Sequence, residues 1–286
     1  MEKLIFTDEM VSSIRQFITE HLTSNDLKDR FKNSILKDEV LDILDLYCTV
    51  VYYPFEDKNH GFHINDIPNS KGEDQHFVYI NTAQCMDRQI FTAAHELGHV
   101  WKVDEYIQKK CNISVSDSQT EDIINRFAAE LLMPEDLFIP FFNYEYKERM
   151  VEEDKITIES ALEIIVVLMN TFMVPMKSVV LRFSELNLFA DDVIKLLQGK
   201  SFLSSQEIDN EISNIIDNFG YEKLKWASKR KFISGLSELL EEAEKKGNIN
   251  SKIISQMRNR FDIKTPSKDG NLDVRVNTTK DKNNDN

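Results

Sequence analysis

Apolar residues recur along the chain at two spacings, and each spacing predicts a different element. Between residues 47 and 55 the run YCTVVYYPF is rich in β-branched and aromatic residues, which is typical of a β-strand. Shorter runs at 61–64 and 75–81 predict two more strands, with asparagine, proline and glycine in the connections. Residues 1–45 and 151–262 instead follow the helical spacing of three to four residues. The pattern therefore predicts an α+β chain with a small sheet.

Changes in this pattern divide the chain into five regions. The sequence predicts N-terminal helices, a core that contains the strands, a helix-turn-helix-like module, a further helical region and a polar tail that is expected to be disordered. The bounds of these regions are 1–45, 46–150, 151–190, 191–262 and 263–286.

One predicted helix carries a polar seam beside an apolar stripe. The stripe is formed by Ile90, Ala94 and Leu97, and it is flanked by His95 and His99. Residues four apart on a helix lie roughly 40° from one another around its axis, so both imidazoles can reach one metal ion. A polar seam on a buried helix needs partners, and a metal ion supplies them. These two histidines are therefore candidate metal ligands.

The residues between the two histidines add a candidate catalytic group. The stretch His95-Glu96-Leu97-Gly98-His99 places Glu96 about one helical step from His95, outside the ligand pair, where it can act as a general base. The chain has six histidines in 286 residues, which makes coincidence a poor explanation of this spacing. Gly98 weakens an isolated helix, but it permits close approach of a neighbouring element or a substrate.

A catalytic zinc ion needs a third protein ligand and an open position. Glu121 is the candidate, because it shares one face of a second predicted helix with Ile124, Ala128 and Leu131. An ionised carboxylate on a buried face is costly unless it is paired or bound to a metal. The alternative interpretation is an ordinary acidic residue in the first turn of the helix, with Asp122 as the ligand instead.

Three further polar residues near these helices receive other interpretations. Asn125, one turn after Glu121, is a candidate hydrogen-bonding partner of a metal ligand. Glu105 is badly phased for a ligand if the first helix continues. Glu130 falls on the opposite side of the second helix from Glu121 and is expected to be solvated.

The two helices together resemble a known family. The run FTAAHELGHV, followed about twenty residues later by EDIINRFAAELLMP, resembles the two motifs of the ImmA/IrrE family of zinc metallopeptidases. The resemblance implies a zincin-like core, which has a small, mostly antiparallel sheet and active-site helices, followed by a helical C-terminal region. It implies His95, His99 and Glu121 as ligands of one Zn²⁺ ion per chain and Glu96 as the general base. Mn²⁺ or Co²⁺ are possible substitutes in such a ligand set.

The resemblance also implies a function. It suggests an endopeptidase that cleaves a helix-turn-helix transcriptional repressor in response to stress or a signal. The alternatives are a protease that acts on another intracellular partner, such as a toxin or antitoxin, and a non-hydrolytic, zinc-stabilised protein-binding module. Glu96 argues against the last, because a purely structural zinc site needs no base. Ile124 stands where the family usually has alanine, which is expected to shift the second helix without removing chemistry.

Composition and charge limit the partners. The formal net charge of −14 argues against broad affinity for nucleic acids or anionic membranes, and the longest apolar run is too short to span a membrane. Three scattered cysteines are typical of reduced thiols, so a cytoplasmic location is expected. In the helix-turn-helix-like module only Lys177 and Arg182 are basic, so packing or substrate docking is favoured over DNA binding.

Other features have less specific interpretations. No ligand spacing connects His60, His63 and His76, so these are interpreted as surface or strand histidines. In the related fold, the edge of the strand before the active-site helix lies over the metal cleft, where an extended substrate can add. Residues 221–246 are predicted to form a single helix, and the basic run 223–231 is favoured as its solvated face over a docking face for an acidic partner.

Overall fold

The structure is a computed structural model that describes residues 4–24, 35–56, 60–68, 74–150, 156–202, 207–247, 249–261 and 263. The chain forms two compact units, Met1–Ser234 and Gly235–Asn286. The elements of the first unit are α1 (Asp8–Ser24), α3 (Glu39–Tyr47), β1 (Thr49–Tyr53), β2 (Gly61–Pro68), β3 (Asp74–Asn81), α4 (Met86–Val100), α5 (Val103–Cys111), α6 (Asp117–Leu132), α7 (Glu135–Glu148), α8 (Ile158–Phe172), α9 (Met176–Glu185), α10 (Asp191–Phe202), α11 (Glu207–Phe219), the 3₁₀ helix η1 (Glu222–Lys225) and β4 (Phe232–Ile233). The second unit contains α12 (Leu236–Lys246) and α13 (Ser251–Arg260). The tail predicted to be disordered, 263–286, lies outside the described residues apart from residue 263.

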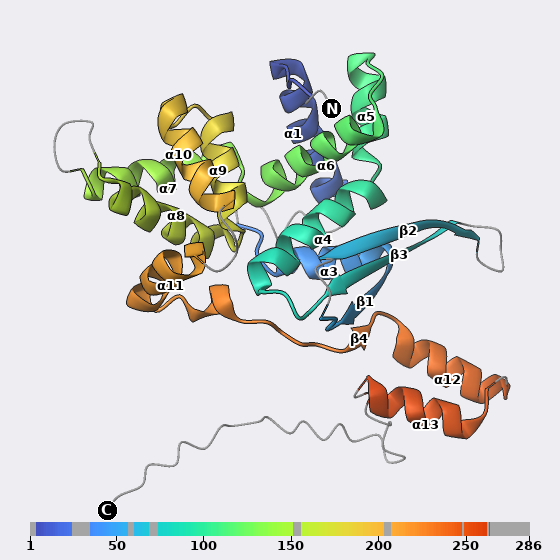
Figure 1. Cartoon of the computed structure of the whole chain (residues 1–286). Coiled ribbons are helices and arrows are strands. Elements are labelled where there is room, and N and C mark those ends of the chain that lie inside the picture. The colour runs from blue at the N-terminus through green and yellow to red at the C-terminus, as the bar shows by residue number, and fades with distance from the viewer. Residues whose placement is uncertain are drawn as a thin grey trace, which may run out of the picture. The chain divides into compact units, whose positions relative to one another are not determined.

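The described strands form one mixed sheet with the order β2-β3-β1-β4. β1 and β3 are parallel, whereas β2 pairs with β3 and β4 pairs with β1 in the antiparallel sense. Figure 1 shows α3 and α4 over one face of this sheet. Inward-facing side chains such as Val50, Val78 and Ile80 are fully buried there. The predicted α+β fold with a small, mostly antiparallel sheet is confirmed.

The strand at the edge of the sheet is not the predicted one. β3, the strand before α4, is paired on both sides, and β2 forms the edge of the sheet on its side (Figure 1). The side chain of Asn81 at the end of β3 is buried, and its Oδ1 accepts hydrogen bonds from the backbone N–H groups of Phe55 and Ala83. A short run of apolar residues predicts a strand but not its neighbours, because strand order depends on contacts distant in sequence.

The predicted single helix over 221–246 is wrong. After η1 the chain is extended, and the backbone oxygen of Trp226 accepts from the N–H of Met86 at 2.9 Å, at the start of α4. Further on, the N–H of Lys229 donates to the oxygen of Thr82, and β4 then pairs with β1. The basic run 223–231 is therefore mostly an extended segment rather than a solvated helix face. These distant backbone partners favour the extended conformation over a helix.

Close packing of α4 on α6 determines where the second motif lies. Gly98 faces α6, and a Cβ atom at this position would lie 2.9 Å from Cδ1 of Phe127 and 3.3 Å from Cγ2 of Ile124. Both α6 side chains are fully buried. Glycine at 98 therefore allows the second motif to approach the first, and Ile124, the departure from the family pattern, packs at this contact.

Glu130 is buried, contrary to expectation. It is 3% exposed, and its carboxylate accepts two hydrogen bonds of 2.8 Å from Arg182 of α9, which is itself fully buried. Arg126 of α6 and Arg15 of α1 also donate to it. The helical period correctly placed Glu130 on the opposite side of α6 from Glu121. That side is not solvated, because α1 and α9 cover it. Glu130 therefore links three helices through charged hydrogen bonds.

Helices α8 and α9 form the predicted helix-turn-helix-like pair. They are bent by 104° at the turn, where Pro175 precedes the first residue of α9. This angle is typical of helix-turn-helix units. However, Arg182 is fully buried against Glu130, so one of the two basic residues cannot contact a phosphate. Among the described residues, no single helix has both the length and the apolar character needed to cross a membrane.

Candidate metal centre

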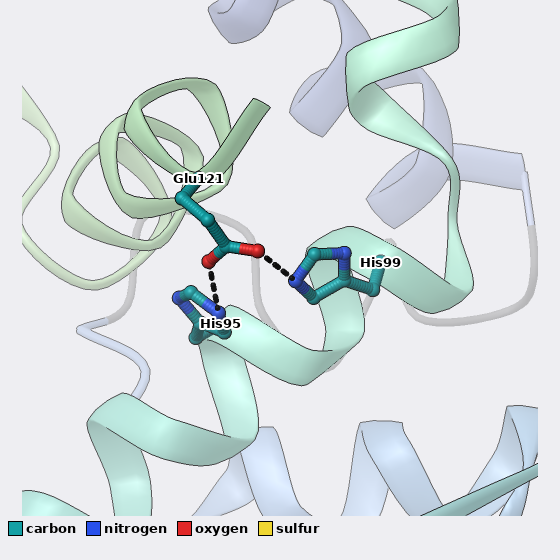
Figure 2. A group of neighbouring side chains, drawn as sticks. All are labelled: His95, His99 and Glu121. Carbon is teal, nitrogen blue, oxygen red and sulfur yellow. Dashed lines mark ion pairs between the residues drawn. The ribbon is translucent and has the colours of Figure 1, made fainter. Parts of the chain in front are cut away.

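Two helices bring the three predicted ligands together. His95 and His99 lie on consecutive turns of α4, and their ring centroids are 5.0 Å apart. Figure 2 shows Glu121 of α6 pointing between the two imidazoles. The distance from His95 Nε2 to Glu121 Oε2 is 3.2 Å, and that from His99 Nε2 to Glu121 Oε1 is 3.5 Å. One donor atom from each of the three residues lies within 4.8 Å of the others.

The donor set fits a divalent metal ion. Two imidazole nitrogens and one carboxylate are the ligands of many catalytic zinc sites, which leave a fourth position open. The Glu121 side chain is 52% exposed, so the group is accessible from solvent. His95 Nδ1 lies 3.1 Å from Asn125 Oδ1, and this contact favours the tautomer in which Nδ1 carries the proton and Nε2 can bind a metal. Asn125 is therefore placed to orient the ring of His95, as its spacing predicted.

The charges of the three groups favour a cation between them. Hydrogen bonding to His95 lowers the pKa of Glu121. Burial lowers the pKa of His95, but the hydrogen bond to Glu121 and the nearby carboxylates outweigh it, so this pKa is raised. Burial and the charge of His95 lower the pKa of His99. A metal ion bound between these groups would supply positive charge beside the carboxylate, as is usual for metal sites built from histidine and carboxylate.

Glu96 lies beside the ligands on α4, but deeper in the protein. It is 6% exposed, and burial raises the pKa of its carboxyl to about 7. The charge of His95 lowers this pKa and that of Glu121 raises it, so the carboxyl is within electrostatic reach of the ligands. A carboxyl with a pKa near neutrality is suited to accept and release a proton.

The alternative acidic residues lie elsewhere. Asp122 Oδ2 accepts a hydrogen bond of 2.9 Å from the N–H of Leu4, so it connects α6 to the N-terminal segment. Glu105 is 66% exposed on α5 and contacts Lys102. Neither residue is in the group that could hold a metal. Of the acidic candidates, the structure brings Glu121 to the histidines.

His63 is close to the metal centre, which its spacing did not indicate. Its ring centroid is 6.2 Å from that of His99, and its Nε2 lies 2.9 Å from Nδ1 of His76. Both are the strand histidines that the sequence predicts, on β2 and β3. The edge strand β2 places one of them beside the α4 ligands. The interpretation as strand histidines is correct, but it missed the nearness of His63, because that depends on how the sheet packs against α4.

Comparison with protein families agrees with this geometry. Residues 45–184 match the model of the Peptidase_M78 family, described as the IrrE N-terminal-like domain. The match includes the sheet strands β1 to β3, the two motif helices and the α8–α9 pair. No curated protein matches the chain. Residues 45–184 are therefore identified as a peptidase domain of the Peptidase_M78, IrrE N-terminal-like kind.

Proposed function

We propose that the chain is a zinc-dependent endopeptidase, with His95, His99 and Glu121 as zinc ligands and Glu96 as the general base. The observation that carries the proposal is the convergence of the three donor atoms within 4.8 Å, with Glu96 on the same helix. The peptidase family of residues 45–184 supports the same reaction class. Zinc is preferred because the donor set is nitrogen-rich and leaves a position open.

Glu96 performs the proton transfers in this mechanism. The chemistry that zinc supplies when bound is Lewis acidity towards carbonyl and water oxygens. Glu96 accepts a proton from the attacking water, whose oxygen forms a bond to the carbonyl carbon of the peptide. Glu96 then donates this proton to the amine nitrogen as the C–N bond breaks, so the carboxyl returns to its starting state. His95 is held in position by Asn125 throughout.

Metal content tests the ligand assignment. The purified wild-type chain is expected to hold about one zinc ion, and Glu121→Ala and His99→Ala are each expected to lose most of it, since two donors bind zinc far more weakly than three. Glu105→Ala is the matched control, because Glu105 is an exposed acid on the neighbouring helix α5. The measurement is zinc per chain by mass spectrometry after dialysis against buffer. Full occupancy in Glu121→Ala, or a metal-free and folded wild type, would contradict the assignment.

The substrate is proposed from the family resemblance. We propose a helix-turn-helix transcriptional repressor, cut in response to stress or a signal in the cytoplasm. The test incubates the zinc-loaded chain with purified repressors from the same organism and identifies fragments by mass spectrometry, with Glu96→Gln as control. We expect one repressor to be cut by the wild type alone. If other proteins are cut and repressors are not, the toxin or antitoxin alternative replaces this substrate, and zinc binding without any cleavage favours the binding module.

A further inference from the structure

A cavity of about 680 Å³ lies at the N-terminal end of the metal-bearing helix α4. Arg88, Phe91 and Thr92 of this helix line it. Positions 88, 92, 95 and 99 share one face of a helix, so the cavity lies on the same side of α4 as the ligands. Thr92 precedes His95 by three residues, which is a rise of about 4.5 Å. The cavity therefore begins about one helical turn from the metal centre.

The edge strand β2 connects the cavity with the metal centre. His60 lines the cavity directly before β2, and a Cβ atom on Gly61 would lie 2.6 Å from Cγ2 of Thr92. Two residues later, the ring of His63 is near that of His99. Three residues of strand span about 10 Å. An extended peptide that follows β2 past the metal centre thus reaches the cavity with a side chain within about three positions of the cleaved bond.

The exposed charged groups that line the cavity are positive. Arg88, Lys177 and Lys225 line it and are exposed, so a ligand can reach them. Lys225 donates to the carboxylate of Asp217, whereas Arg88 donates to a neutral group, the side-chain oxygen of Gln84. This hydrogen bond leaves the positive charge of Arg88 in place at the cavity.

Asp87 also lines the cavity, but its carboxyl is turned into the protein. Its side chain is 6% exposed. Burial raises the pKa of this carboxyl to about 6, and backbone N–H groups at the start of α4 and the charge of Arg88 oppose the rise. Burial and the charge of Arg88 also lower the pKa of His60 at the strand end of the cavity. Charges elsewhere on the chain are screened by salt beyond about 8 Å. The exposed cations therefore determine the ligand charge that the cavity favours, which is negative.

The start of α9 adds backbone donors. The residue before this helix and the three residues of its first turn all line the cavity, namely Pro175, Met176, Lys177 and Ser178. In the described part of the chain, no side chain caps the start of α9, and its first turn contains no acidic residue. The N–H groups and the dipole at a helix N-terminus favour an anion.

A buried hydroxyl at the same place lacks a partner. Ser178 is 8% exposed and lines the cavity, and no hydrogen bond of its hydroxyl is found among the described residues. Buried polar groups are usually hydrogen-bonded, and an O–H group donates most strongly to an ionised acceptor. A carboxylate in the cavity would therefore satisfy Ser178 and the start of α9, and Arg88 would attract it.

The remaining walls of the cavity are mostly apolar. Met169 of α8 and Met176 of α9 line one side, and Ile212, Ile216 and Leu224 line another. The last three belong to α11 and η1, which follow the matched residues 45–184. Long methionine and isoleucine side chains are suited to pack against aliphatic groups. The cavity thus fits an anion with an aliphatic part better than a small inorganic anion.

We propose that this cavity is a substrate subsite for an acidic side chain, glutamate or aspartate, of the peptide. The carboxylate accepts from the hydroxyl of Ser178 and from the N-terminus of α9, and Arg88 supplies positive charge. The aliphatic part of the side chain packs against Met169 and Met176. This inference rests on the proposed peptidase function, since it assigns the cavity to a peptide held beside the metal centre. It names a substrate class, namely peptides with an acidic residue near the cleaved bond.

Binding of amino-acid analogues tests the subsite without catalysis. The full chain is labelled with ¹³C at its nine methionine methyl groups, and the signals of Met169 and Met176 are assigned with Met169→Leu and Met176→Leu. N-acetyl-glutamate methylamide is expected to shift these two signals with a dissociation constant on the order of 1 mM. The glutamine analogue has the same shape without the charge, and it is expected to bind at least about tenfold more weakly.

Two variants locate the carboxylate. Ser178→Ala removes a buried hydroxyl that has no partner, so the fold is expected to be retained while the glutamate analogue binds about threefold more weakly or worse. Arg88→Gln is expected to weaken it by at least as much. Ser184→Ala, at an exposed position of α9, and Lys109→Gln, at an exposed position of α5, are the matched controls and should bind as the wild type does.

The subsite is wrong if neither methionine signal shifts in a saturable way, if the glutamine analogue binds within about tenfold of the glutamate analogue, or if both variants bind normally. Tighter binding of the arginine analogue would overturn the assigned charge. Tighter binding of N-acetyl-leucine, which has a free α-carboxylate, would assign the cavity to the C-terminal end of a peptide instead of a side chain.

Metal binding and cleavage do not enter this measurement. A chain that binds the glutamate analogue but holds no zinc would contradict the proposed function alone. A chain that cuts peptides but does not bind the analogue would contradict the subsite alone.

Discussion

Glu96→Gln is expected to lower the rate of peptide cleavage by about 10²–10⁴-fold while zinc content and fold are retained. Glutamine has nearly the shape of glutamate, but its amide cannot accept the proton of the attacking water. Because Glu96 is 6% exposed and its burial disfavours the ionised carboxyl, the neutral amide should not lower the stability of the fold. The largest effect is therefore expected on catalysis rather than on structure.

The measurement combines peptide cleavage, zinc per chain and thermal unfolding for the same preparation. Glu105→Gln is the control, since it makes the same chemical change on the exposed face of α5. Cleavage at the wild-type rate by Glu96→Gln would remove Glu96 from the mechanism. Loss of zinc from this variant would instead show that Glu96 contributes to metal binding.

Glu130→Ala is expected to lower the free energy of unfolding by about 3–5 kcal/mol. The reason is the partner that it leaves behind, because Arg182 is fully buried and donates two hydrogen bonds to this carboxylate. Replacing both members of a buried ion pair with apolar residues is often tolerated, but removing one leaves an uncompensated charge. Arg126 and Arg15 add further positive charge at the same place.

Urea unfolding followed by circular dichroism measures this effect. Glu135→Ala is the matched control, since Glu135 also contacts Arg15 but its side chain is 40% exposed. The expected cost of the control is about 0–1 kcal/mol. A loss of less than about 1 kcal/mol for Glu130→Ala would mean that Arg182 finds water or another acceptor, and that the network stabilises the fold little.

The same network gives stability a dependence on acid pH. Burial by itself raises the pKa of Glu130, but the hydrogen bonds and charges of Arg182, Arg15 and Arg126 outweigh it and hold the pKa at about 2, below its ordinary value of 4.5. This contribution is complete above about pH 4.5 and is lost as the pH falls towards about 2. A shift of this size corresponds to roughly 3 kcal/mol. In Glu130→Gln the loss of stability over this range should be smaller by that amount.

The network also explains how the helix-turn-helix-like pair relates to the peptidase core. Arg182 of α9 binds Glu130, which lies on the same helix as the candidate ligand Glu121. Arg15 of the N-terminal helix α1, which is distant in sequence, binds the same carboxylate. The α8–α9 pair is therefore fixed to α6 through Arg182. This buried residue is one of the two basic residues that the sequence offered for DNA binding.

The local features of this protein were determined by the sequence alone. The spacing of His95, Glu96 and His99 sets their positions on one helix, because helical geometry depends only on residues within a turn or two. The strands β1 to β3 and the helices α4, α6, α8 and α9 were predictable for the same reason, from the period of their apolar residues. The motif pair limited the reaction class, and the net charge limited the partners, without any knowledge of contacts.

Contacts distant in sequence were decided only by the tertiary structure. The helical period of α6 showed that Glu121 and Glu130 lie on different faces of the helix. It did not show that α1 and α9 cover Glu130. It likewise could not show that β2 is the edge strand, that His63 lies near His99, or that residues 226–233 are extended against the sheet and α4. Each of these features depends on which surfaces of the protein meet. A local pattern of apolar residues predicts that a surface is buried, but it does not predict which element covers that surface.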